Sequence, residues 1–200
     1  MLSKVFVIGL SRTGTTSVHH ALIRLGYRSA HWTHSSGRLL ELTDLYDLDA
    51  AGDIGISFAF ETLARAFPSA LFIYTTRERE AWVGSITRHY DAASPAIVAE
   101  RWADRKLEDR NRSTGFENTL LWRLIHDSLY LNHQTWGEAY EAHELAVASF
   151  FGQSEKQSAR LLTLDVTTSE DQWLKLGAFL RMSPPPEPFP NVTWQSAAQR

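Results

Sequence analysis

Three short runs of apolar residues stand out along the chain and predict buried β-strands. They cover residues 4–9, 71–76 and 160–164. The first two are rich in β-branched and aromatic side chains, which is typical of strands covered on both faces in a parallel sheet. A shorter stretch, residues 53–57, is interpreted as a further strand or strand end.

Between these strands the apolar positions recur at helical spacing. Val18, Leu22 and Leu25 predict a helix over 15–25, which Gly26 ends as a C-terminal glycine does. Similar patterns predict helices over 37–49, 58–67, 78–90, most of 95–150 with a polar break at 111–115, and 169–181. Strands that alternate with helices predict an α/β fold: a three-layer parallel sheet with extra helices in the C-terminal half. The length, 200 residues, suits a single domain over 1–200.

Composition narrows the classes of partner and chemistry. The chain has 20 Lys and Arg against 23 Asp and Glu, which argues against a general binder of nucleic acid or of an anionic membrane. It has no cysteine, so disulfides and thiolate chemistry are excluded. No apolar run approaches the roughly 18–20 residues of a membrane span, and no signal peptide is visible. We therefore expect a cytoplasmic protein. The histidines form no compact ligand set, so we also expect no metal.

The turn after the first strand has the chemistry of an anion site. Gly9 and Gly14 let the backbone turn tightly, so that successive amide groups and a helix N-terminus face one point. Arg12 adds a planar fork of donors suited to tetrahedral oxyanions. Hydroxyl and amide donors complete the expected cofactor-binding set, which is Ser11, Arg12, Thr13, Gly14, Thr15, Thr16 and Ser17. An ATPase loop would have Lys after its second glycine, where this chain has Thr15. The alternative interpretation is a tight turn without a ligand.

A second candidate anion site follows the strand at 71–76. Arg77 ends this strand, and Ser85 lies eight residues later in the next predicted helix. An arginine with a hydroxyl makes a good phosphate site. Alternatively, Arg77 caps that helix or pairs with Glu78 or Glu80. Two anion sites on neighbouring strand ends imply a ligand with two separated phosphate-type groups.

These two motifs together resemble those of sulfotransferases that use 3′-phosphoadenosine 5′-phosphosulfate (PAPS), in particular the small bacterial and fungal group. Residues 12–17 match the family's 5′-phosphosulfate loop, and Arg77 with Ser85 matches its 3′-phosphate motif. Further resemblances to the narrower group lie at Asp53, residues 67–70, Tyr140, His143, residues 160–162, Trp173, Leu176 and residues 188–190. The resemblance implies a P-loop NTPase-like topology, PAPS as cosubstrate with 3′-phosphoadenosine 5′-phosphate (PAP) as product, and transfer without a metal.

The resemblance also implies roles at the reacting centre. Arg12 would stabilise the leaving phosphate. A base must accept the proton of the acceptor, and Asp53 stands about where the animal enzymes carry a catalytic histidine. Asp53 is alternatively a helix cap or a turn residue. His20 is a further catalytic candidate, and His31 and His34 are candidates for lining the acceptor pocket. The chain lacks the C-terminal Arg-Lys-Gly motif with which the animal enzymes hold the 3′-phosphate.

Three functions remain open on the sequence. The first is sulfuryl transfer from PAPS to a hydroxyl or amine of a small molecule or glycan, with no nucleic acid or membrane as partner. The second is a nucleotide kinase or NTPase with a degenerate loop, against which the missing Lys argues. The third is a non-catalytic nucleotide-binding protein on the same scaffold. The acceptor and the oligomeric state are not readable from these residues.

Overall fold

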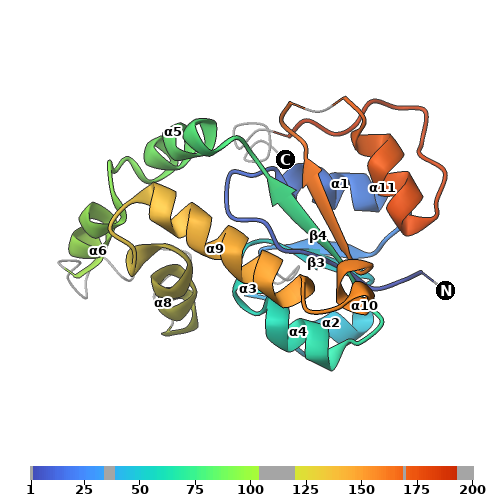
Figure 1. The fold of residues 1–200 in the computed structure, drawn as a ribbon, viewed down its shortest axis with the longest axis horizontal. Coiled ribbons are helices and arrows are strands. Elements are labelled where there is room, and N and C mark those ends of the chain that lie inside the picture. Colours follow the sequence, from blue (N-terminus) through green and yellow to red (C-terminus); the bar gives the residue numbers. More distant parts are fainter. Residues whose placement is uncertain (1, 34–38, 104–119, 169, 193–200) are drawn as a thin grey trace. The chain divides into compact units, whose positions relative to one another are not determined.

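The computed structural model describes residues 2–33, 39–103, 120–168 and 170–192. The chain forms two compact units, one made of residues 1–77 with 150–200 and the other of residues 78–149. Figure 1 gives the order of the elements along the chain.

The first unit is built on a parallel sheet of five strands in the order β2-β3-β1-β4-β5. The strands are β1 (Val5–Val7), β2 (Ser29–His31), β3 (Ala50–Gly52), β4 (Leu71–Thr76) and β5 (Leu161–Asp165). The central strand β1 is followed by a helix leading to β2 on one side, whereas β4, on its other side, is followed by β5 further out. The predicted α/β fold with a parallel sheet is therefore confirmed, and its strand order is consistent with a P-loop-like topology.

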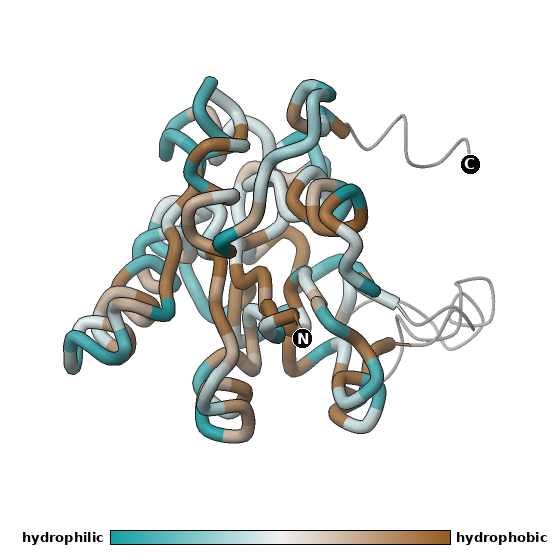
Figure 2. The backbone as a smooth tube through the Cα atoms, turned by 90° about the vertical axis from the view of Figure 1, so that its right-hand side faces the viewer, coloured by the Kyte–Doolittle hydropathy of each residue, from teal (hydrophilic) through white to brown (hydrophobic). Residues whose placement is uncertain are grey.

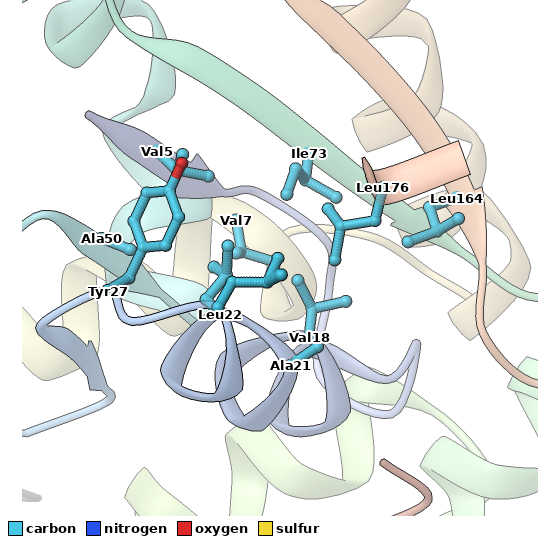
Figure 3. Close-up of a cluster of buried hydrophobic side chains, with 11 residues drawn as sticks. Val5, Val7, Val18, Ala21, Leu22, Tyr27, Ala50, Ile73, Leu164 and Leu176 are labelled. Atoms are coloured by element: carbon cyan, nitrogen blue, oxygen red, sulfur yellow. The ribbon is translucent and has the colours of Figure 1, made fainter. Parts of the chain in front are cut away.

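Alternation along β1 builds a layer on each face of the sheet. Val5 and Val7 are buried with Val18 and Leu22 of α1 (Thr15–Arg24) and Leu176 of α11 (Gln172–Leu180) (Figure 3).

Phe6, between the two valines, faces the other way. Its ring lies 5.4 Å from that of Phe67 and 5.5 Å from that of Phe72, and Phe72 in turn contacts Phe151. The helices α3 (Ile54–Phe58) and α4 (Phe60–Ala66) lead into this aromatic layer. The predicted three layers are thus helix, sheet and helix.

Two predicted elements are wrong. The leucines of 37–49 form only one short helix, α2 (Asp44–Asp47), and Leu39 instead forms an isolated bridge with Thr33; positions 37 and 38 lie outside the described residues. Leu42 is half exposed, so the leucine spacing does not mark one buried face. The expected strand at 53–57 is helix α3, because the strand has already ended at Gly52.

The second unit is helical. It contains α5 (Arg79–Tyr90), α6 (Pro95–Ala103), α8 (Leu120–His126), the π-helix η1 (Asp127–Leu131) and most of α9 (Trp136–Phe151). The expected break at 111–115 lies outside the described residues. In Figure 2 hydrophobic and hydrophilic stretches alternate along the coiled segments of the chain, as in helices with one buried face.

Aromatic side chains fill the interior of this second unit. Tyr90 stacks on Trp136 with ring centres 5.2 Å apart, and Trp102 packs against Trp122 at 4.3 Å. Trp102 therefore has a packing role. His126 is buried against Trp122, and burial lowers the pKa of His126 to about 4.

Candidate active site at the carboxyl edge of the sheet

Polar side chains gather where the parallel strands of the first unit end. All five strands run the same way, so the residues that follow them share one edge of the sheet, where ligands of such sheets bind. His31 ends β2, Asp53 follows β3, and Arg77 follows β4. The loop 9–14 leaves the central strand β1 between them. The candidate site is therefore assembled from four different strand ends.

The loop after β1 turns by way of two residues with positive φ. Arg12 has φ 73° and Gly14 has φ 101°. Thr13 fixes the turn between them: its hydroxyl donates to the Leu10 carbonyl at 2.7 Å and bonds the Thr75 hydroxyl at 2.6 Å. Gly14 then opens α1, and no side chain caps this helix start. The first-turn amides and the positive end of the helix dipole are thus the groups that an anion would meet.

The two glycines of the loop are required by close approach. A Cβ on Gly9 would lie 1.8 Å from the Thr75 hydroxyl oxygen, and one on Gly14 would lie 2.0 Å from a methyl of Val166. Real side chains do not approach this closely. The glycine spacing recognised in the sequence is therefore a steric requirement of the β1 loop against β4 and the residue after β5.

Arg77 reaches the loop. Its guanidinium donates to the backbone carbonyl of Arg12 at 3.4 Å, and the residue is half-buried. The residues that follow Arg77 have contacts of their own. Glu78 caps α5 by accepting from the amides of Glu80 and Ala81, and Arg79 pairs with Glu80. Two predicted anion-binding arginines thus meet at one loop.

Ser85, the predicted partner of Arg77, is a buried residue of α5 in the second unit. Its part in a phosphate site stays a prediction from sequence spacing.

His31 is the residue that joins the loop to the strand ends beside it. Its Nε2 lies 3.1 Å from the Thr15 hydroxyl and 3.4 Å from the Thr16 hydroxyl. Its Nδ1 lies 3.9 Å from a carboxylate oxygen of Asp53, and both side chains are less than a fifth exposed. The sequence suggested His31 only as a lining residue. Its position in β2, paired in register with Gly52, explains the contact with Asp53.

Asp53 has the most strained backbone in the site. Its φ of 98° and ψ of −179° lie in a region that is essentially reserved for glycine. It stands at the N-cap of α3, but its side chain makes no capping hydrogen bond, so the helix-cap interpretation fails. A strained residue with a largely buried carboxylate is typical of a functional position.

One of the two histidines of α1, His19, lies next to His31. His19 bonds the Ser29 hydroxyl at 2.8 Å, and its ring is 5.5 Å from that of His31. Burial, with smaller effects of His31 and His20, lowers the pKa of His19 to about 3, so His19 is neutral. The ring of His20 lies 5.2 Å from that of His19. A catalytic role of His20 stays a prediction; the histidine beside the loop hydroxyls is His31.

Two predicted cofactor-binding hydroxyls have bonds inside the protein. Thr13 is engaged in shaping the loop, as described above. Ser17 is buried and accepts a hydrogen bond from the Val192 amide at 3.1 Å, which leaves its own hydrogen to donate. The segment leading to Val192 is fastened by Trp173, whose indole donates to the Glu187 carbonyl. The family-like positions Trp173 and 188–190 thus serve to hold the C-terminal segment.

Arg160, another family-like position, has a structural role. Its guanidinium donates to the carbonyls of Ala64, Phe67 and Ala70. It thereby satisfies the C-terminal carbonyls of α4 and fixes the turn before β4.

Among the residues that the structure describes, no group of three or more His, Asp or Glu is placed to hold a metal ion. Within the same residues, no helix has the length and apolar character needed to cross a membrane.

The model of the sulfotransferase domain family matches residues 4–44 and 39–198, which include nearly all of both compact units and every candidate site residue named above. No curated protein matches the chain.

Proposed function

The chain belongs to the sulfotransferase domain family, and we propose that it transfers a sulfuryl group from PAPS to a hydroxyl or amine of a small molecule or glycan. The observation that carries this proposal is the β1 loop. It presents an uncapped helix start and Arg12, with Arg77 bonded across it, and it has Thr15 where an ATPase would need Lys. Family membership favours this function over a kinase or NTPase.

The leaving group is the 5′-phosphate of PAP. During transfer the acceptor oxygen or nitrogen bonds to sulfur while the bond between sulfur and the phosphate oxygen breaks, so negative charge grows on that phosphate. We assign the first-turn amides of α1, Arg12 and the hydroxyls of Thr15 and Thr16 to this charge. Donors fixed in advance stabilise the transition state without reorganisation. Because a sulfuryl group carries less charge than a γ-phosphoryl group, no metal is needed in this proposal.

The proton of the acceptor needs a base, and Asp53 is the proposed one. Its carboxylate is largely buried at the strand edge and is not used as a helix cap. A base positioned in this way typically contributes about 10²–10⁴-fold to the rate. Arg77, with Ser85 as predicted from the sequence, is assigned to the 3′-phosphate.

Calorimetric titration with PAP in EDTA tests the nucleotide site. We expect metal-independent binding that Arg77→Ala and Arg12→Ala weaken at least tenfold, while Arg65→Ala, an exposed arginine paired with Glu61 on α4, has no effect. Absence of PAP binding, or preference for ATP with Mg²⁺, would refute the proposal. Tight PAP binding without turnover across a broad acceptor screen would instead support a non-catalytic binding protein.

A further inference from the structure

We propose that His31 is a positioning residue that takes up a proton when the loop of residues 9–17 binds its anion. The inference rests on the proposed function only for the identity of that anion. The donor and acceptor roles that the two imidazole nitrogens of His31 must take when the anion binds support this proposal.

The hydroxyls of Thr15 and Thr16 each have a single hydrogen. Without an anion, that hydrogen can point to Nε2 of His31, which lies 3.1 Å from the Thr15 oxygen. An oxyanion at the helix start accepts hydrogen bonds only, so a hydroxyl that serves the anion must turn its hydrogen away from His31. His31 then has to donate from Nε2 instead of accepting there.

The other ring nitrogen of His31, Nδ1, lies 3.9 Å from the Asp53 carboxylate, which is itself an acceptor when ionised. A ring with hydrogen only on Nε2 would turn a lone pair towards that carboxylate. Hydrogen on both nitrogens satisfies the threonine oxygens and Asp53 together. The imidazolium is therefore the form that fits the anion-bound site.

The titratable groups that the structure places against His31 include Asp53 at the start of α3 and His19 on α1, with His20 beyond His19. His19 is held neutral by burial and is a poor candidate for the proton. Asp53 attracts the proton to His31. The positive charge then acts on the leaving phosphate through the two threonine hydroxyls, so His31 positions these donors rather than touching the nucleotide.

Calorimetry in paired buffers measures the proton directly. The enthalpy of binding PAP at pH 8 is compared in two buffers of different ionisation enthalpy, and the difference gives the protons taken up. An imidazolium that forms on binding at this pH draws its proton from the buffer. We expect His31→Gln to take up about one proton fewer than the wild type while still binding PAP, because the glutamine amide can donate but cannot titrate. The affinity of the wild type for PAP should rise up to about tenfold for each pH unit lowered relative to this variant.

Controls separate the possible sources of the proton. His133→Gln, in the second unit, should leave the uptake unchanged, and Asp53→Asn should reduce it. Equal uptake in the wild type and His31→Gln would overturn the inference, as would loss of uptake in His20→Gln instead. A purely structural role of His31 would change affinity without changing proton uptake.

Inorganic pyrophosphate serves as a second probe of the loop alone. If PAP does not bind but pyrophosphate binds with proton uptake that His31→Gln removes, the proposed nucleotide is wrong and the role of His31 stands. If neither anion binds, both proposals fall.

Discussion

The turns that follow β1 and β3 both require a residue with positive φ, and they use different residues for it. Both strands must turn sharply at the sheet edge and enter a helix, at Thr15 and at Ile54. After β1 the closest approaches are met by glycines, and Gly14 has φ 101°. After β3 the positive φ, 98°, falls on Asp53, whose ψ of −179° differs from the 19° of Gly14. Glycine would be the less strained choice there, so the carboxylate is present for another reason than the turn, which agrees with its proposed role as base.

Replacement of Asp53 tests this comparison most strongly. Asp53→Asn keeps the size and shape of the side chain but removes the base, so sulfuryl transfer should fall about 10²–10⁴-fold with PAP binding retained. Asp53→Gly should lose activity similarly yet raise the free energy of unfolding by about 1–3 kcal/mol, as strain is relieved. Steady-state kinetics and urea unfolding measure the two effects. A less stable glycine variant would show that the residue is not strained.

Replacement of Gly14 in the β1 loop should change the free energy of unfolding in the opposite direction from Asp53→Gly. Gly14→Ala places a methyl against Val166 and at an unfavourable φ, and should destabilise the protein by about 1–3 kcal/mol while weakening PAP binding. Val166→Ala in the same chain should restore part of both. A double-mutant cycle in urea unfolding gives the coupling, and additivity of the two changes would show that the contact with Val166 is not responsible.

Thr13 holds the β1 loop by buried hydrogen bonds. Thr13→Val leaves the Thr75 hydroxyl without its 2.6 Å partner and should cost about 1–3 kcal/mol of stability. The pair Thr13→Val and Thr75→Val together should cost less than the sum of the two single changes. Thermal or urea unfolding of the four proteins checks this, and equal costs in both backgrounds would exclude the bond as the cause.

His19, packed behind His31, should make the stability of this side of the site depend on pH. Its pKa is lowered from about 6.5 to about 3 on folding. The unfolded chain therefore binds a proton first, so the contribution of neutral His19 is complete above pH 6.5 and declines as the pH falls towards 3. At pH 5 the loss is about 2 kcal/mol. His19→Gln should reduce the fall in stability between pH 7 and pH 5, and parallel curves for the two proteins would contradict the assignment.

The sequence predicted those elements whose signal is local. The long apolar strand β4 and the helices α1 and α5 are marked by their own residues. Strands β2 and β3 were not predicted, since each has only three residues and β3 consists of Ala50, Ala51 and Gly52. The stretch 37–49 carries helically spaced leucines but forms only one helical turn, α2. Among the described leucines of this stretch, only Leu45 is buried in a core.

The candidate site likewise contains a part that local sequence predicts and a part that it does not. The β1 loop can be recognised from its residues alone, because its glycines, hydroxyls and Arg12 lie within nine consecutive residues whose close spacing dictates a turn into a helix. The positions of His31 between Thr15 and Asp53 and of Arg77 beside the Arg12 carbonyl follow from the fold and not from local sequence. Their cause is the pairing of parallel strands. It aligns the ends of segments that are separated by about twenty or more residues, and no local pattern records which of those ends become neighbours.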